Sequence, residues 1–422
     1  MPYDLDDPAF FATNAVEKEL RRVTALCDSC RRCYRLCTSF DYMLDEAVDR
    51  NDGDVAKITS GDFRKIVDLC WQCKLCYNHC PYTPPHAWDI DFPRLMLRAK
   101  AARVKEEGVT LQDAWLGDVD RIGALGCAAA PFSNWANAAK PHRILLEAAA
   151  GVDRNRNLPT FHRQTFARWF RQRGGAKNTA GRPLAFFSSC SVNYNEPQVG
   201  RDAVSVLERN GCAVSCPEQV CCGMPYLDGG DIEAARANAA RNLAVLRPLV
   251  DQGAPVVVPQ PTCSYVLKKE YPMLVPGEDA QKVAAATQDF FEYLAGRKQE
   301  GTLVTDFPGK SPGKVAYQMP CHLRAQNMGF KTRDVLQLVP GTKVSVVEKC
   351  TAMDGTWAMK KEYYPLSLEY ARKAVKEMDA SAPDVHATDC TLSALQIEAV
   401  RGKKPAHPIR LLREAYGLPE ER

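Results

Sequence analysis

Eight cysteines near the amino terminus constrain this chain most strongly, because they form two runs with the same spacing. Both runs read Cys-x-x-Cys-x-x-Cys-x-x-x-Cys. They consist of Cys27, Cys30, Cys33 and Cys37, and of Cys70, Cys73, Cys76 and Cys80. Three thiolates at these intervals can bind three irons of one cube from a single loop, while the fourth cysteine of each run reaches the neighbouring cube. The spacing therefore predicts two [4Fe–4S] clusters in an α-helical ferredoxin-like module, and hence single-electron chemistry.

The fourth cysteine of each run, Cys37 or Cys80, determines how the eight thiols are divided between the two clusters. Pro81 follows Cys80, and a residue before proline is held extended, which lets it reach the other loop. Thr38 stands where the first run would carry proline, so the crossing is less strongly indicated for Cys37. We expect one cluster on Cys27, Cys30, Cys33 and Cys80, and the other on Cys70, Cys73, Cys76 and Cys37. A zinc ribbon is the alternative, but zinc requires four ligands and these runs supply eight.

The bulk composition narrows the class of protein. A net charge of +4 over 422 residues does not indicate nucleic-acid binding. The 18 cysteines are clustered in a long chain, which is typical of thiolate–metal chemistry in a reducing compartment. Residues 1–10 are acidic, unlike a signal segment, and no apolar run is long enough for a membrane span. We expect a cytoplasmic protein, with peripheral attachment to the inner face of the cytoplasmic membrane as an open alternative.

The order of predicted elements indicates an α+β multi-domain chain. Residues 1–105 form the expected two-cluster module, with helices at 16–26 and 63–69 leading into the runs, and residues 106–182 form a helical connector. Strands and helices then alternate twice, which predicts two α/β domains with mostly parallel sheets at 183–305 and 306–422. The expected strands are 184–188, 212–216 and 255–259 in the first domain, and 315–319, 343–348 and 385–388 in the second.

The end of the connector, residues 161–182, combines basic and aromatic side chains without any acidic residue. It can be read as a solvated helix followed by a flexible linker. The alternative is an interfacial helix that rests on anionic lipid or on an acidic partner.

A second set of cysteines follows the predicted strands. Cys190, Cys222 and Cys263 in the first α/β domain are matched by Cys321, Cys350 and Cys390 in the second, at nearly constant offsets of about 130 residues, which indicates an internal duplication. Ligands bind at the carboxyl edge of such sheets. We therefore expect these cysteines, with Cys221, to converge on two sites or on one shared cleft. Cys127, Cys212 and Cys216 fall outside this pattern and are expected to be core residues.

Four segments carry a resemblance to a known family. Val-Cys-Cys-Gly-Met-Pro (220–225), Pro-Thr-Cys-Ser-Tyr (261–265), Pro-Cys-His-Leu-Arg (320–324) and Cys-Thr-Ala-Met-Asp-Gly-Thr-Trp (350–357) resemble the cysteine-rich "CCG" domains in the B subunit of heterodisulfide reductase. With the preceding two-cluster module, the chain resembles the family of the C subunit of anaerobic glycerol-3-phosphate dehydrogenase. Glycolate oxidase iron–sulfur subunits are similar. In heterodisulfide reductase, such domains hold non-cubane iron–sulfur clusters that reduce a disulfide.

The chain departs from that pattern in its ligand supply. The reductase closes each domain with Cys-x-x-Cys, whereas here single cysteines, Cys263 and Cys390, stand in those places, and Thr351 replaces the second cysteine of the later pair. Four thiols remain in the first site and three in the second. His322 is the preferred additional ligand, because imidazole ligates some clusters, with Asp354 or Ser393 as alternatives. Trp71 and His79 flank the second run and can tune a cluster there.

These features favour an electron-transfer subunit with at least one cluster beyond the two cubanes. It would relay electrons between a flavin-bearing dehydrogenase partner and a quinone or a redox protein, since no flavin or nicotinamide fingerprint is present. One alternative is a disulfide reductase acting at the CCG-type site, which would make the chain an enzyme in its own right. Another is an electron donor to a rubrerythrin-like diiron protein.

Overall fold

Two separate parallel sheets organise the computed structural model, which describes residues 5–421. The first has the order β2-β1-β3-β4 and the second β6-β5-β7, so β1, β2 and β3 correspond in position to β5, β6 and β7. The bounds are β1 (Arg182–Phe186), β2 (Cys212–Ser215), β3 (Val256–Val258), β4 (Thr287–Asp289), β5 (Lys314–Gln318), β6 (Lys343–Val347) and β7 (Val385–Ala387). The predicted alternation of strands and helices is present in both units, whereas β4 was not predicted. The ends of the expected terminal domains, residues 1–4 and 422, lie outside the described residues.

Helices flank each sheet and bury one face, as their apolar spacing predicted. On α15 the side chains of Ala239, Leu243 and Leu246 are buried, at the i, i+4 and i+7 positions of one face. The first unit contains α12 (Cys190–Tyr194), α13 (Pro197–Arg209), α14 (Met224–Gly229), α15 (Ile232–Asp251), α16 (Pro261–Tyr265), α17 (Tyr271–Leu274), α18 (Glu278–Ala286) and α19 (Phe290–Gln299), with a π-helical turn at Val266–Glu270. The second contains α20 (Cys321–Ala325), α21 (Lys331–Leu336), α22 (Tyr364–Ala380), α23 (Thr391–Arg401) and α24 (Pro408–Ala415), with a 3₁₀ turn at Trp357–Met359.

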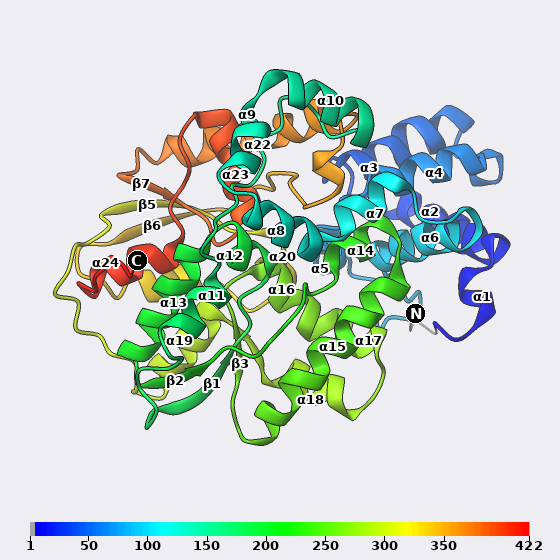
Figure 1. Cartoon of the computed structure of the whole chain (residues 1–422). Coiled ribbons are helices and arrows are strands. Elements are labelled where there is room, and N and C mark those ends of the chain that lie inside the picture. Colours follow the sequence, from blue (N-terminus) through cyan, green and yellow to red (C-terminus); the bar gives the residue numbers. More distant parts are fainter. Residues whose placement is uncertain (1–4, 422) are drawn as a thin grey trace.

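The amino-terminal module is helical and carries both cysteine runs. Val16, Leu20 and Val23 of α2 are buried in its core, and a capping box between Thr59 and Asp62 starts α4. Its helices are α1 (Pro8–Phe11), α2 (Thr13–Cys30), α3 (Thr38–Asp41), α4 (Ser60–Asp68), α5 (Leu75–His79) and α6 (Phe92–Glu107), with a π-helix at Tyr42–Val48 and 3₁₀ turns at Asp49–Asn51 and Val55–Lys57. The module and the carboxyl-terminal helix α24 lie at opposite ends of the molecule (Figure 1).

Four helices between the module and the sheets form what we call the apolar roof: α7 (Leu111–Gly117), α8 (Val119–Ala128), α9 (Phe132–Ala138) and α10 (Lys140–Ala150). In Figure 1, α8 crosses the middle of the molecule, with α9 and α10 above it. Residues 122–139 contain no charged residue. Leu125, Phe132 and Trp135 of this stretch are 63%, 66% and 64% exposed, so the roof presents hydrocarbon to its surroundings. Residues 122–139 were expected to be part of a connector, but they form an exposed apolar surface.

The structure corrects the expectation for residues 161–182. Phe166, Trp169 and Phe170 of α11 (Phe166–Gln172) are buried in the core beside β1, and Arg173 forms an ion pair with Glu208 at 2.8 Å. The aromatic face is thus already covered by the first α/β unit. The segment is neither an interfacial helix nor a solvated one, because its apolar side chains supply part of the core. None of the helices in residues 5–421 is both long and apolar enough to cross a bilayer.

The two α/β units share one hydrophobic core. Helix α24 of the second unit packs on α13 of the first, where Arg413 pairs with buried Asp202 at 3.1 Å. The Tyr416 hydroxyl lies 3.4 Å from the Asn210 amide, and it donates to the Val304 carbonyl oxygen at 2.7 Å. The carboxyl terminus thereby holds the two sheets in a fixed relation.

Mild acid is expected to destabilise this junction through His407 at the start of α24. Its Nε2 donates to the Asp389 carbonyl oxygen and its Nδ1 accepts from the Ile409 amide, so the buried ring is neutral. Burial lowers the pKa of His407 to about 3. An unfolded histidine binds a proton near pH 6.5, so this stability is complete above that pH and is lost as the pH falls below it. We expect a loss of about 1–1.5 kcal/mol between pH 7.5 and 5.5 from this residue.

His407→Asn retains a capping oxygen and removes the titration, so its unfolding free energy should depend less on pH than that of the wild type. Urea titrations at several pH values measure the difference. Equal pH dependence in both proteins would contradict this assignment.

Candidate metal centres

Both cysteine runs wrap through a left-handed residue at the same place. Arg31 follows the second cysteine of the first run with φ 47°, and Lys74 follows that of the second with φ 63°. Gln72 is also left-handed, with φ 54°. This conformation is costly for a residue with a side chain and is characteristic of functional loops. The strained turns bend each run so that its thiols face inward.

Each fourth cysteine lies beside thiols of the other run, and its role as a ligand of that run's cluster stays a prediction. Cys80, at the end of α5, is extended (φ −80°, ψ 123°), and so is Cys37 (φ −158°, ψ 165°), although Thr38 rather than proline follows it. Burial, and then the neighbouring thiols of Cys33, Cys80 and Cys30, raise the pKa of Cys27 to about 12. Cys37 lies near Cys70, Cys73 and Cys76 in the same way. The structure thus forms two groups of four thiols, each with three members from one run and one from the other.

The surroundings of these sulfurs fit iron–sulfur ligation. The Gln72 amide donates to Cys70 Sγ and the Tyr82 backbone to Cys80 Sγ, both at 3.4 Å. Such N–H···S bonds stabilise thiolate ligands and tune the cluster potential.

The first CCG-type site is built at the carboxyl ends of β1, β2 and β3. Cys190 begins α12, Cys221 and Cys222 precede α14, and Cys263 lies in α16. Gly223, in the left-handed region with φ 95°, turns the chain directly after the paired cysteines. The four thiols lie next to one another in the order Cys190, Cys221, Cys222, Cys263. The predicted convergence at this sheet edge is therefore present.

The thiols of the second CCG-type site lie next to those of the first. Cys321 and Cys350 are adjacent, and Cys390 lies near both Cys321 and Cys263. The Ala352 amide donates to Cys350 Sγ at 3.2 Å, and the Ser393 amide to Cys390 Sγ at 3.4 Å. The thiols at the two sheet edges thus line one shared cleft. A shared cleft was one of the two arrangements expected from the sequence, the other being two separate sites.

A continuous series of thiols links this cleft to the amino-terminal module. Cys73 of the second run lies near Cys350, and Cys76 lies near Cys33 of the first run. Trp71 packs between them, with its ring 5.1 Å from that of Trp357. The pKa of Cys350 is lowered to about 7, first by the Cys321 thiol and then by the Ala352 and Trp71 N–H groups, although burial alone would raise it. Trp71 therefore affects the Cys350 thiol of the second CCG-type site, in addition to its position beside Cys70 in the second run.

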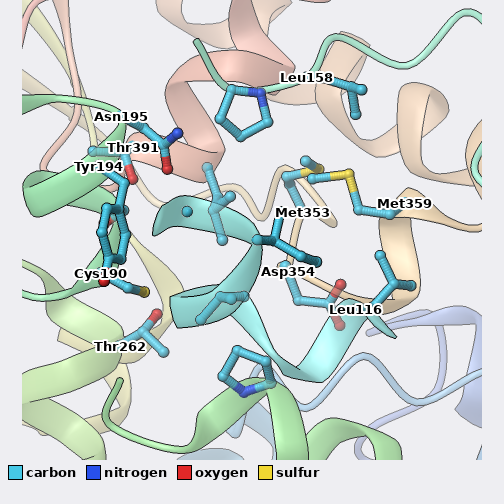
Figure 2. A pocket seen from close by; sticks show the side chains of 18 of the residues that line it. Leu116, Leu158, Cys190, Tyr194, Asn195, Thr262, Met353, Asp354, Met359 and Thr391 are labelled. Carbon is cyan, nitrogen blue, oxygen red and sulfur yellow. The ribbon is translucent and has the colours of Figure 1, made fainter. Parts of the chain in front are cut away.

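All seven CCG-type thiols line one cavity of about 590 Å³. Figure 2 shows Cys190 and Tyr194 on one side of this cavity, and Met353, Asp354 and Met359 on the other. The apolar roof closes it, with Leu116, Ile122 and Leu125 among the lining residues. One side of the cavity is thus lined by thiols, and the side formed by the roof is lined by apolar side chains.

Two contacts fix the roof over the thiols. Asp120 of α8 accepts the Cys221 backbone N–H at 2.6 Å. A Cβ on Gly123 would stand 2.3 Å from the Tyr194 ring, so only glycine permits α8 to approach this closely. The uncharged run at 122–139 is the sequence signal that could have revealed this helix as part of the site.

The structure corrects the expectation that His322 is a ligand. Its Nδ1 lies 2.9 Å from the Thr262 hydroxyl and its Nε2 3.0 Å from the Gln72 carbonyl oxygen, while its ring stacks on Tyr265. Burial lowers the pKa of His322 to about 4, so the ring is neutral. Both nitrogens are occupied in joining the module to the two α/β units, and neither is free for iron.

The alternatives to His322 differ in how far they are engaged elsewhere. Asp354 Oδ1 accepts the backbone N–H groups of Thr356 and Ala358, which leaves Oδ2 without a partner among the described residues, and the Ser393 hydroxyl pairs with that of Thr351. The second site supplies three thiols, and Asp354 as a further ligand stays a prediction.

The remaining candidate residues behave as core or peripheral groups. Cys127 and Cys212 are buried, and Cys216 packs against the shared core. Cys127 Sγ lies 3.5 Å from the Tyr194 carbonyl oxygen, and Cys212 Sγ lies 3.2 Å from the Tyr293 hydroxyl. These three cysteines are core residues, as predicted. His79 is exposed, with Nε2 3.3 Å from the Arg32 carbonyl oxygen, at the outer side of the first thiol group.

One buried ion pair at the site was not predicted. Lys74, between Cys73 and Cys76, lies 3.3 Å from Glu270 of the first α/β unit, and both side chains are at most 2% exposed. Burial would raise the pKa of Glu270, but Lys74 and Arg94 hold it below its usual value. The pair joins residues far apart in the chain, and nothing in the local sequence of either indicates the other.

Known proteins share both parts of this architecture. Residues 20–106 match the Citrate utilization protein B Fer4-like domain, and residues 184–268 and 315–398 each match the cysteine-rich CCG domain. Together these matches imply iron–sulfur clusters.

Two curated relatives match large parts of this chain. The C subunit of anaerobic glycerol-3-phosphate dehydrogenase from Escherichia coli (strain K12) is 32% identical over 333 residues, covering 78% of this chain and 82% of the relative. Lactate utilization protein A of Bacillus cereus (strain B4264) is 29% identical over 219 residues, covering 49% of this chain and 87% of the relative. With its thiols in one connected series and this similarity over most of its length, the chain belongs to the family of the C subunit of anaerobic glycerol-3-phosphate dehydrogenase, a family of iron–sulfur electron-transfer proteins.

Proposed function

We propose that this chain relays electrons from a flavin-bearing dehydrogenase subunit to a quinone or a redox protein. One [4Fe–4S] cluster would be held by Cys27, Cys30, Cys33 and Cys80, and the other by Cys70, Cys73, Cys76 and Cys37. The thiols of the shared cleft would hold at least one more cluster. The clusters supply one-electron transfer, and the protein holds them in sequence and excludes water.

The connected series of thiols is the observation that carries this proposal. Cys33 lies near Cys76, Cys73 near Cys350, and Cys390 near Cys263, so each group adjoins the next. An enzyme with one isolated site would not need such a series. Electron transfer requires it, because each centre must lie close to its neighbour.

The two ends of the series differ in their surroundings. At the end formed by the first run, the aromatic side chains of Tyr34 and Trp88 are 37% and 38% exposed, where a protein partner could contact them. At the other end, the thiols face the cavity beneath the apolar roof. The relative from Escherichia coli is named as a dehydrogenase subunit, which supports a dehydrogenase as the partner.

Iron and sulfide counts on anaerobically purified protein test the cofactor content. We expect more than about eight irons per chain, since two cubanes alone account for about eight. Low-temperature EPR during a reductive titration should show a signal beyond those of the cubanes. Zinc in place of iron would overturn the proposal, and a count of about eight would remove the additional site.

Disulfide reduction at the shared cleft is a second candidate. It is favoured by one observation, that Cys221 and Cys222, although buried, line the cavity. Reduced protein should then be reoxidised by a small disulfide. Reoxidation by a quinone but not by a disulfide would exclude this candidate. Electron donation to a rubrerythrin-like diiron protein stays a prediction.

A further inference from the structure

The chemistry of the cavity walls restricts what the cavity can bind. Beyond the thiols, its lining is dominated by aliphatic and aromatic side chains from the roof, and no Lys or Arg is among the lining residues that the structure describes. A charged disulfide or carboxylate would lose its hydration here without gaining a counter-ion. The cavity of about 590 Å³ lies within the range of roughly 300–1,000 Å³ that is usual for ligand sites, and the proposed cluster would take only its thiol side, so the side beneath the roof is the part left for a small aromatic molecule. The cavity therefore suits an uncharged, flat and mainly apolar molecule.

Besides Trp71, whose Nε1 lies beside the Cys350 thiol, three side chains that line the cavity have polar atoms without a partner among the described residues. Gln260 Nε2, Asp228 Oδ1 and Asp354 Oδ2 are buried and make no hydrogen bond with the described residues. Gln260 is 4% exposed and Asp228 is 6% exposed. Buried polar atoms without partners are costly and uncommon, so a cluster of three in one cavity points to a ligand that satisfies them.

Two of these groups form a carboxyl pair. Asp228 ends α14 in the first α/β unit, and Asp354 lies in the second, where Figure 2 shows it bordering the cavity. Burial, followed by the charge of Asp354, raises the pKa of Asp228 well above its usual value, and burial also raises that of Asp354. The other charged groups that face the pair are Lys100, Lys74, Glu270 and Lys360. Two neighbouring carboxyls cannot both ionise readily, so the pair retains a proton.

We propose that the cavity binds a carbonyl-bearing ring of the quinone class, with Gln260 Nε2 donating to one carbonyl oxygen and the Asp228–Asp354 pair protonating the other. This inference rests on the proposed electron relay and assigns its acceptor site. The ring gains two electrons from the reduced relay and two protons, so both C=O groups become C–OH. One O–H bond of the carboxyl pair breaks to supply the first proton, and water supplies the second. The carboxylate is then reprotonated from solvent.

The mouth of the cavity indicates where a tail on such a ring would lie. Leu125 and Phe132 line the cavity and are also largely exposed at its edge, and Trp135 lies on the same helix as Phe132. An isoprenoid tail leaving the cavity would cover these side chains. Burial of the methylene groups of a short tail should strengthen binding by at least tenfold.

Equilibrium dialysis of the anaerobically purified, cluster-loaded chain tests binding, with menadione as the tail-less probe. We expect Gln260→Leu to weaken menadione binding at least tenfold, since it keeps the shape and removes the donor. A naphthoquinone with a short prenyl tail should bind at least tenfold more tightly than menadione to the wild type. Glu233→Gln, on the exposed face of α15, is the matched control and should bind as the wild type does.

The proton role is tested with Asp354→Asn and with Asp354→Glu, which restores a carboxyl. Asp354→Asn should bind menadione as tightly as the wild type but reduce it at least tenfold more slowly when dithionite supplies the electrons. Infrared spectra of the resting protein at pH 7 should show a protonated carboxyl band that Asp354→Asn removes. Asp354→Glu should recover the band and most of the rate. Wild-type rate and spectrum in Asp354→Asn would overturn the proton role.

The relay and the acceptor site fail in distinguishable ways. If the EPR signals are reducible by dithionite but menadione does not bind, the acceptor site is wrong and the relay stands. If Gln260→Leu binds menadione like the wild type, the assigned position of the ring is wrong. If no iron–sulfur signal is present, the proposed function itself fails.

Discussion

Cys222→Ser is expected to remove the additional iron–sulfur signal and to slow electron delivery to any acceptor at least 100-fold, while both cubane signals persist. Cys222 lies between Cys221 and Cys263 in the row of thiols at the first α/β unit. A serine oxygen is a poor substitute for a soft thiolate ligand, so the cluster would be lost from that position. The two groups of four thiols in the amino-terminal module come from different loops and would be unaffected. Iron counts and EPR on the same preparation measure both parts of this result.

Cys212→Ser is the matched control. Cys212 is fully buried in the shared core, and its sulfur lies near the Tyr293 hydroxyl rather than near another thiol. The exchange should leave the iron content unchanged. Should Cys222→Ser retain the extra signal, or lose the cubane signals as well, our placement of the additional cluster would be wrong.

Lys74→Met is expected to destabilise the folded protein by about 3–5 kcal/mol, because it strands the Glu270 carboxylate in an almost fully buried position. The lysine also donates to the Gln72 side chain at 2.8 Å, within the loop of the second run. Loss of the ion pair therefore affects both the junction between domains and the loop that holds four of the thiols. Anaerobic urea titrations followed by tryptophan fluorescence give the change in unfolding free energy.

The double variant Lys74→Met with Glu270→Gln separates the buried charge from the other effects. Removing both partners of a buried ion pair is often nearly neutral, so the double variant should recover most of the lost stability. Lys105→Met removes an exposed ion pair with Glu233 and serves as the control, with stability expected to be unchanged. A double variant as unstable as Lys74→Met would show that the buried carboxylate is not the cause.

The local pattern of the chain predicted which thiols lie together, but it predicted the surroundings of the site poorly. The spacing of the two runs, with Pro81 after Cys80, was sufficient to predict which thiols meet, because adjacent loops and an extended residue act over short distances. The paired cysteines with Gly223 predicted a tight turn, which is present with φ 95°. His322 was misassigned, because a histidine beside a cysteine has the same local pattern whether it binds iron or hydrogen-bonds to a distant loop.

The aromatic residues of α11 show the same limit. Phe166, Trp169 and Phe170 alternate with arginines as they would on a membrane surface, and only the position of β1 shows that they are covered. The exposed apolar surface lies instead on the roof, around Leu125 and Phe132. Hydrophobic side chains signal burial or contact, but their partner is set by packing between distant elements.

By itself, the sequence determined that this protein carries two cysteine loops of equal spacing and two α/β units with thiols at their strand ends. Those features depend on spacing within a few residues, where bond lengths and backbone conformation limit the outcome. Only the tertiary structure decided that the thiols of both runs and of both α/β units form one series, that a single cavity joins both units, and that Asp228, Gln260 and Asp354 line it. Such contacts join residues far apart in the chain, and they arise from the burial of apolar surface between domains, which no local spacing encodes.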